Sequence, residues 1–137
     1  MEHIKEPEKR DLVCGMYLTG LPDVRTFSHG GKTFSFCGDG CLKRFERNPQ
    51  KFQGTPLIHL HRIYKTFTMG VAETQVLRGL DTYIWEGDFV SIIGASGSGK
   101  STMLNMMGLL DRPTSGKIFV RGQDVSTLSD EEAALLR

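Results

Sequence analysis

The sequence contains few cysteines, no long apolar stretch and almost no net charge. Cysteine occurs three times in 137 residues, and an odd number cannot all pair within the chain. No stretch approaches the roughly 18 uncharged apolar residues of a membrane span, and residues 1–10 lack the apolar segment of a secretory signal. Seventeen Lys and Arg nearly balance sixteen Asp and Glu, which excludes a generally basic nucleic-acid-binding chain. We therefore expect a cytoplasmic protein whose reduced thiols serve metal or redox chemistry.

The chain divides into two parts of different composition. All three cysteines and five of the eight phenylalanines lie before residue 53, whereas apolar runs such as FVSII at residues 89–93 lie after residue 56. The segment QGTP at residues 53–56 has turn composition and falls at this change. We predict a mobile charged tail at residues 1–10, a small domain at 11–53, a linker at 54–56 and a second domain at 57–137.

Local patterns predict a hairpin and a short helix in the first part. Two alternating segments flank Gly30-Gly31, which is a hairpin signal, and the predicted strands are residues 24–29 and 32–37. Asp39 can cap a helix that ends at Asn48-Pro49.

The second part alternates strand and helix patterns. The predicted strands are residues 57–64, 81–85, 89–93 and 118–120, and we expect the strand at 89–93 to be buried. Residues 100–110 form an apolar helix, in which we expect Met103, Met106 and Met107 to fill the core rather than to bind metal. Ser129 and Glu132 form a capping box that begins a helix. No stop signal precedes Arg137, as expected if the sequence was cut within this helix.

Residues 94–101, GASGSGKS, fit the pattern G-x-x-x-x-G-K-[ST] at every specified position. Glycines allow successive backbone N–H groups to turn toward phosphates, and the helix that follows presents its N-terminus to the same anion. Lys100 would contact the β- and γ-phosphates, and the Ser101 hydroxyl would bind Mg²⁺. A strand before and a helix after the loop are the expected context of such a site. The pattern therefore predicts a nucleotide phosphate-binding loop rather than a chance Gly/Ser-rich segment.

Residues 57–137 resemble the beginning of an ABC transporter ATPase domain of the macrolide-exporter and lipoprotein-releasing class. The matching run begins LIHLHRIYKTF and includes SIIGASGSGKSTMLNMMGLLDRPTSGKI. The resemblance implies a partial α/β P-loop NTPase core that binds ATP and Mg²⁺, and it assigns the adenine-stacking ring to Phe67, with Tyr64 as the alternative. The implied nucleotide contacts are Gly94, Ala95, Ser96, Gly97, Ser98, Gly99, Lys100, Ser101 and Thr102.

Members of that family continue with a Gln loop, a Leu-Ser-Gly-Gly-Gln signature, an Asp-Glu pair and a switch His. None of these follows Arg137 in this sequence, and Asp124 does not replace the missing carboxylate because Arg121-Gly122-Gln123 separates it from the strand. Hydrolysis by this chain alone is therefore not expected. The resemblance implies the N-terminal part, or a truncated remnant, of an ATPase that pairs with a second copy and a membrane permease at the inner face of the cell membrane.

The cysteines follow the spacing C-x22-C-x3-C, with Cys37 at the end of the hairpin and Cys41 near the start of the helix. A thiol near a helix N-terminus has a lowered pKa, and three thiolates suit Zn²⁺ or Cu⁺. Together with DLVCGM and GKTFSFC, this spacing resembles a YHS domain of the TRASH-like metal-binding group, although Leu12 replaces the usual Pro. The resemblance implies a small zinc-ribbon-like α+β domain with Cys14, Cys37 and Cys41 as metal ligands.

Several readings stay open at the level of sequence. The cysteines could instead be buried reduced thiols or a redox switch. A fourth ligand is not evident, since we expect His29 at an exposed turn and His59 and His61 on the surface of a strand. The alternative function is a non-enzymatic metal-binding or metal-chaperone protein with a vestigial phosphate loop. Nucleic acid is not an expected partner, because the basic residues Lys43, Arg44, Arg47 and Lys51 suit a solvated helix face.

Overall fold

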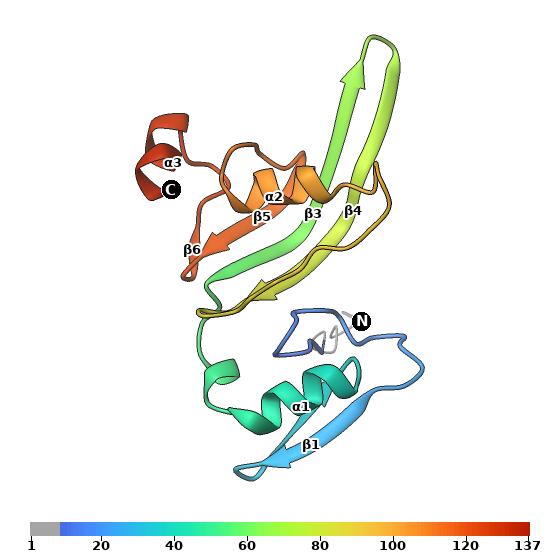
Figure 1. The fold of residues 1–137 in the computed structure, drawn as a ribbon, viewed down its shortest axis with the longest axis vertical. Helices are drawn as coiled ribbons and strands as arrows, with labels where there is room; N and C mark the ends of the chain where they lie inside the picture. Colours follow the sequence, from blue (N-terminus) through green and yellow to red (C-terminus); the bar gives the residue numbers. More distant parts are fainter. Residues whose placement is uncertain (1–8) are drawn as a thin grey trace, which may run out of the picture. The chain divides into compact units, whose positions relative to one another are not determined.

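The computed structural model describes residues 9–137 and contains two compact units, the first ending at Thr55 and the second beginning at Pro56 (Figure 1). The predicted tail lies outside the described residues except for Lys9 and Arg10. Arg10 pairs with Tyr17 in an isolated antiparallel bridge, and its guanidinium lies 4.1 Å from the centre of the Tyr17 ring. The Lys9 carbonyl accepts a hydrogen bond from the Leu18 N–H at 2.9 Å. These two residues therefore contact the loop of the first unit that carries Tyr17 and Leu18.

The first unit combines a β-hairpin with a helix, which confirms the α+β prediction. Strands β1 (Arg25–His29) and β2 (Lys32–Phe36) are antiparallel, and helix α1 (Asp39–Arg47) and the short 3-10 helix η1 (Lys51–Gln53) follow. The core is a cluster of phenylalanine rings around Phe45, whose neighbours are Phe27, Phe34, Phe36 and Phe52. Phe36, Phe45 and Phe52 are buried, and such rings bury much apolar surface for their number.

Asp39 does not cap α1, contrary to the prediction. The N-cap residue is Gly38, and no side-chain cap bond is present there. The Asp39 carboxylate instead accepts a hydrogen bond from Arg25 Nε at 2.8 Å. The Asp39 carboxylate thus pairs with Arg25 on β1 instead of accepting helix N–H groups, and Asp39 is the first residue of the helix.

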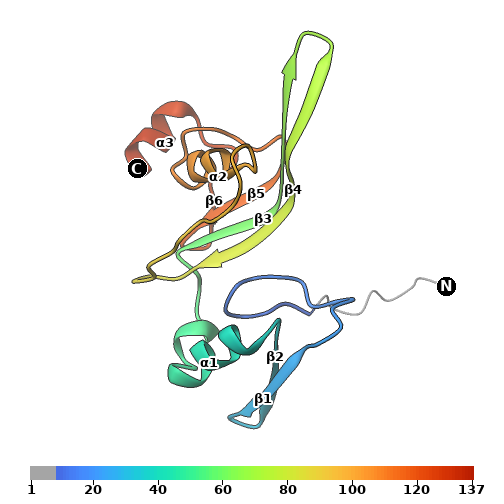
Figure 2. The ribbon, with the colours of Figure 1, turned by 45° about the vertical axis from the view of Figure 1, so that its right-hand side comes forward.

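The second unit is an antiparallel sheet with one helix packed on it (Figures 1 and 2). The sheet order is β4-β3-β5-β6, where β3 spans Ile58–Met69, β4 spans Ala72–Ile84, β5 spans Ser115–Val120 and β6 spans Gln123–Asp124. Strands β3 and β4 form a hairpin far longer than the predicted strands at 57–64 and 81–85. The remaining elements are α2 (Lys100–Met107) and α3 (Asp130–Leu136).

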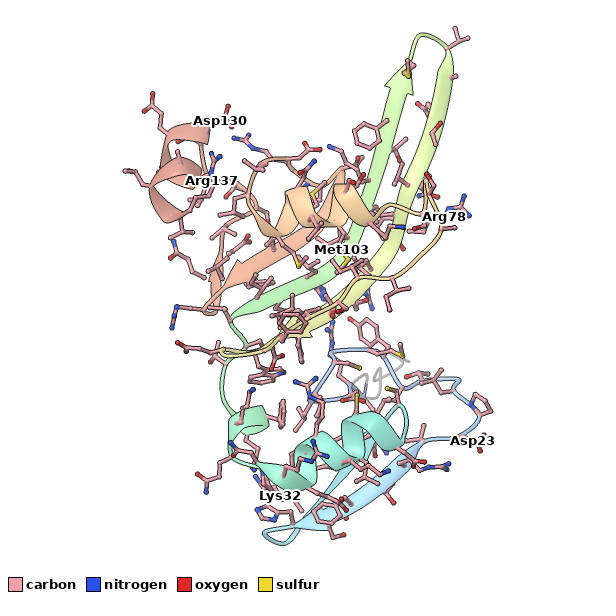
Figure 3. The ribbon with its side chains drawn as sticks, viewed as in Figure 1. Asp23, Lys32, Arg78, Met103, Asp130 and Arg137 are labelled. Atoms are coloured by element: carbon pink, nitrogen blue, oxygen red, sulfur yellow. The ribbon has the colours of Figure 1, made fainter. Side chains whose placement is uncertain are left out.

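The core of the second unit lies between the sheet and α2. Its buried members come from four elements and one loop: Leu60, Ile63, Leu77, Met106, Ile118 and Val125. Met103 and Met107 pack against them, which confirms that the α2 methionines fill the core (Figure 3). None of the helices among the described residues has the length and hydrophobicity of a membrane span.

The predicted buried strand at residues 89–93 is absent. These residues form no regular secondary structure, and Phe89 and Ile93 are 97% and 93% exposed. A buried strand needs a hydrogen-bonding neighbour on each side. No described strand pairs with this segment, so its apolar side chains lack the neighbouring strands that would bury them.

Local chemistry explains where α2 ends and where α3 begins. Helix α2 stops at Met107 instead of residue 110 because Gly108 is its C-cap and Leu109 adopts a positive φ of 56°. The predicted capping box is confirmed, since Ser129 Oγ accepts the Glu132 N–H and the Glu132 carboxylate accepts the Ser129 N–H.

Candidate functional site

The phosphate loop, residues 94–101, runs directly into the N-terminus of α2. Gly97 and Gly99 have φ values of 79° and 96°, which residues with a Cβ rarely adopt. A Cβ at Gly99 would lie 3.0 Å from the side chains of Val76 and Leu77, so only glycine lets the loop pass this close to β4. The Gly99 carbonyl accepts the Met103 N–H at 2.9 Å and so begins the ladder of α2.

Lys100 closes the loop on itself. Its ammonium donates to the Gly94 carbonyl and, at 3.1 Å, to the Ala95 carbonyl. The loop borders a pocket of about 430 Å³ lined by Val76, Ser96, Gly97, Gly99, Lys100, Ser101 and Thr102. The structure therefore gathers the helix N-terminus, the lysine and the Ser101 hydroxyl at one concave site. These groups can bind an anion through N–H donors, positive charge and the helix dipole.

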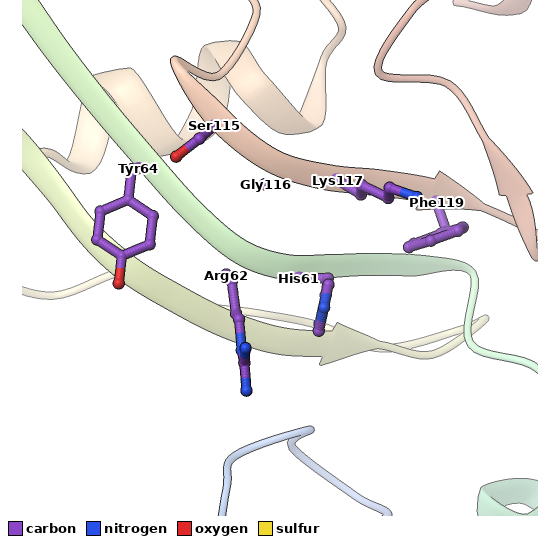
Figure 4. A pocket seen from close by; sticks show the side chains of 7 residues that line it. All are labelled: His61, Arg62, Tyr64, Ser115, Gly116, Lys117 and Phe119. Atoms are coloured by element: carbon purple, nitrogen blue, oxygen red, sulfur yellow. The ribbon is translucent and has the colours of Figure 1, made fainter.

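The two aromatic residues considered for adenine lie on different sides of the sheet. Phe67 is 42% exposed, and the Lys65 ammonium lies 5.1 Å from the centre of its ring. Lys65 also bonds Asp111 Oδ1 at 3.0 Å, in the turn that follows α2, so Lys65 and Phe67 share the face that carries the helix. Neither Phe67 nor Tyr64 lines the phosphate-loop pocket. Tyr64 lines a separate pocket of about 510 Å³ with His61 and Phe119 (Figure 4).

In the first unit the three cysteines meet. Cys37 Sγ lies 3.8 Å from Cys14 Sγ and 3.7 Å from Cys41 Sγ. These distances exclude a disulfide, whose sulfur atoms are about 2.05 Å apart. With Zn–S bonds of about 2.3 Å, a tetrahedral zinc site has sulfur atoms about 3.8 Å apart. The observed spacing therefore fits three ligands of one tetrahedral ion.

Asp11 completes this group, and sequence reasoning assigned it no role. One ligand atom from each of Asp11, Cys14, Cys37 and Cys41 lies within 4.8 Å of the others, and we call these four residues the cysteine cluster. Asp11 is wholly buried. Its Oδ1 accepts the N–H groups of Val13 at 2.7 Å and Cys14 at 3.2 Å, and its Oδ2 accepts the Cys37 N–H at 2.8 Å. The carboxylate thus joins the two cysteine-bearing loops.

The three thiols hold their protons unequally. The hydrogen bond from Cys41 lowers the pKa of Cys14, while burial raises the pKa of Cys37 to about 12. The bond that Cys41 donates to Cys14, reinforced by burial, raises the pKa of Cys41. The expectation that the thiol near the helix N-terminus would have a lowered pKa is therefore wrong, because its bond to the neighbouring sulfur and its burial dominate.

The histidines divide between the units. His29 is exposed at the end of β1 and is not a member of the cysteine cluster. His59 and His61 are partly exposed on β3, and they form a group with Asp81. The His-x-His spacing on a predicted strand is the sequence signal for this group. Asp81 lies on the next strand, and no local pattern indicates that it meets the histidines.

Comparison with known protein families separates the same two parts. Residues 10–55 match the YHS domain, and residues 77–137 match the ABC transporter family.

Individual relatives match about three fifths of the chain. The macrolide export ATP-binding/permease protein MacB of Azoarcus sp. (strain BH72) is 52% identical over 84 residues, which are 61% of this chain and 13% of that protein. The lipoprotein-releasing system ATP-binding protein LolD of Xylella fastidiosa is 47% identical over 89 residues, which are 65% of this chain and 37% of that protein. The chain therefore spans about an eighth of the first relative and little more than a third of the second.

Solved structures give the same assignment. The dimeric bacterial ABC transporter cassette MJ0796 superposes with a TM-score of 0.57 at 44% identity, over 58% of this chain and 34% of that one. A second structure of MJ0796, in a post-hydrolysis state bound to ADP and Pi, gives the same TM-score at 42% identity and the same coverage. The chain thus contains one segment that matches the YHS domain, residues 10–55, and one that matches the ABC transporter family, residues 77–137, and the structural likeness to the cassettes indicates a partial P-loop NTPase core.

Proposed function

We propose that the chain is an ATP-binding component of a transporter and that its N-terminal domain holds a transition-metal ion. The observation that carries the proposal is the glycine loop that, together with Lys100 and Ser101, lines a pocket at the N-terminus of α2. The segment around it is 52% identical to an ATP-binding/permease protein, which supports ATP as the anion.

In this proposal the phosphates of ATP bind the backbone N–H groups at residues 97–102. Lys100 now donates to the Gly94 and Ala95 carbonyls, and in the complex its ammonium would donate to phosphate oxygens instead. Ser101 would supply a hydroxyl to Mg²⁺. Phe67 would stack on adenine, because it lies on the same face of the sheet as α2 and offers a partly exposed ring.

The cysteine cluster would hold Zn²⁺ or another soft ion such as Cu⁺. Cys14, Cys37 and Cys41 would be the ligands, and Asp11 would hold the two cysteine loops together and offset the ion's charge. The sulfur spacing supports this assignment, as does the match of residues 10–55 to the YHS domain. Binding would release thiol protons, so affinity depends on competition with protons.

The relatives suggest how such a component would work in the cell. MacB is an ATP-binding/permease protein, and the MJ0796 cassette is dimeric. We infer that this chain, or the longer protein of which it is a part, pairs with a second copy and with a membrane permease at the cytoplasmic face.

Replacing Lys100 by Ala is expected to weaken Mg-ATP binding by the full chain about ten- to hundred-fold, because one charge-assisted contact is worth about 1.5–3 kcal/mol. Isothermal titration calorimetry with Mg-ATP measures the change. Lys117→Ala is the matched control, since Lys117 is an exposed lysine of the same unit, on β5. Equal affinity of the Lys100→Ala variant and the native chain would refute the nucleotide assignment.

Replacing Cys37 by Ser is expected to abolish the thiolate-to-metal absorption of the Co²⁺-loaded chain. Cys37 lies within 3.8 Å of both other sulfur atoms, so its loss removes the central ligand. Ultraviolet absorption under reducing conditions detects the band, and Ser35→Ala on β2 is the control. A native chain that takes up Co²⁺ without such a band would show that the thiols are not ligands.

A second candidate function is metal binding or metal delivery without a nucleotide. It is favoured by residues 89–93, which precede the loop, form no strand, and expose Phe89 and Ile93. Stoichiometric zinc in the cysteine cluster together with no calorimetric response to Mg-ATP would select this function over the first.

A further inference from the structure

His59, His61 and Asp81 form a second group of metal-ligating side chains, which we call the histidine cluster. One ligand atom from each lies within 4.8 Å of the other two. His59 and His61 are two residues apart on β3, so they share a face of the sheet. Leu60 between them points into the core that α2 covers, and the histidines therefore lie on the opposite face.

A β-bulge brings Asp81 into the group. The pairing of β3 with β4 shifts between Leu60 and Ile63, and Arg62 adopts a positive φ of 47° there. Asp81 Oδ1 accepts the Arg62 N–H at 3.1 Å, which ties the carboxylate to the bulge. The Asp81 side chain is only 9% exposed, against 33% for His61. The Asp81 carboxylate is thus more buried than the imidazole of His61.

Aromatic side chains hold the His59 ring in place. The ring of Phe119 on β5 stacks on it at 5.3 Å and 22°. The ring of Tyr83 on β4 meets it edge-on at 4.6 Å and 82°. A ring confined between two others loses less entropy when it binds a ligand. Figure 4 shows Phe119 and Lys117 on β5, beside His61 on β3.

His61 and Asp81 are spaced as two ligands of one ion. His61 Nδ1 lies 3.5 Å from Asp81 Oδ1, which is longer than the 2.7–3.2 Å of an N–H···O hydrogen bond. Ligand atoms about 2.0–2.1 Å from a tetrahedral ion are about 3.3–3.4 Å apart. The ligand atom of His59 lies within 4.8 Å of the other two.

We propose that the histidine cluster binds a divalent first-row transition metal, Zn²⁺ in the first instance, independently of the cysteine cluster. Two imidazoles and one carboxylate suit Zn²⁺, and three protein ligands leave one position for water. The nearest basic side chain on β5 is Lys117, which pairs with His61 across the strands. Its ammonium lies 3.9 Å from Asp124 Oδ2 on β6, so a carboxylate offsets its charge.

Titration of the full, metal-free chain with Co²⁺ under reducing conditions tests the proposal. The expected stoichiometry is two: one ion with thiolate-to-metal absorption and one with only the weak visible bands of a nitrogen and oxygen site. His59→Ala and His61→Ala should each remove the second ion and keep the thiolate band. Asp81→Asn keeps an acceptor for Arg62 and should weaken the second ion at least about tenfold. His29→Ala, a histidine of the first unit, should change neither.

A second measurement uses only the native chain, so its result does not depend on whether the variants fold. Co²⁺ should broaden the imidazole ring signals of His59 and His61 in nuclear magnetic resonance spectra and leave those of His29 sharp. A single bound ion with thiolate absorption would overturn the proposal. So would a second ion that survives both histidine substitutions, or broadening that spares His59 and His61.

Discussion

The Asp11→Ala variant is expected to unfold residues 9–55 at room temperature while the second unit stays folded. The carboxylate is wholly buried and accepts three backbone N–H groups, those of Val13, Cys14 and Cys37. Each buried donor left without a partner costs about 1–3 kcal/mol, and a unit this small has only about 3–5 kcal/mol of stability in total. Amide nuclear magnetic resonance spectra resolve the two units and report the loss directly.

Two other aspartate substitutions calibrate this prediction. Asp23→Ala removes an exposed carboxylate of the same unit and should leave the spectrum unchanged. Asp11→Asn keeps one acceptor oxygen and should fall between the native chain and the alanine variant. Native dispersion of the first-unit amides in Asp11→Ala would mean that the carboxylate does not hold the cysteine loops together.

The Gly116→Ala variant is expected to destabilise the second unit by about 3–5 kcal/mol. Gly116 is the second residue of β5 and has a φ of 97°, and a Cβ there would lie 2.2 Å from the Arg62 carbonyl oxygen and 2.7 Å from that of His61. Because these neighbours are backbone atoms of β3, the strands must separate to admit a methyl group. Trp85 is the single tryptophan, is 3% exposed and belongs to this unit, so its fluorescence follows urea unfolding.

Gly70→Ala is the matched control for this substitution. Gly70 also has a positive φ, 64°, but nothing lies within 4 Å of its Cβ position. Only the conformational cost of roughly 1 kcal/mol is expected there. If both variants unfold at the same urea concentration, close packing of β5 against the bulge of β3 is not what requires glycine at position 116.

The features that could be predicted from sequence depend on local chemistry. The hairpin at residues 25–36 follows from Gly30-Gly31 and alternation, and the final helix follows from the Ser129–Glu132 capping box. The phosphate loop combines glycine and lysine at a spacing that few other structures require. In each case the residues that interact are neighbours in the sequence.

The features that sequence reasoning missed depend on contacts between distant segments. Asp11 bonds Cys37 across 26 positions, and Asp81 meets His61 across 20. Arg25 takes Asp39 from the helix that it was expected to cap. The apolar pattern at residues 89–93 indicates a buried strand, but burial needs neighbouring strands, which a local pattern does not specify.

Amide chemical shifts of the full, ¹⁵N-labelled chain during titration with Mg-ATP test most directly whether the glycine loop binds a triphosphate. We predict saturable shifts at residues 96–102 and at Phe67, with no change in residues 9–55. Inorganic tripolyphosphate should move the loop signals alone, because it has no base to stack on Phe67. Saturable shifts that spare residues 96–102, or no shifts at all in folded protein, would contradict the assignment of this loop to ATP.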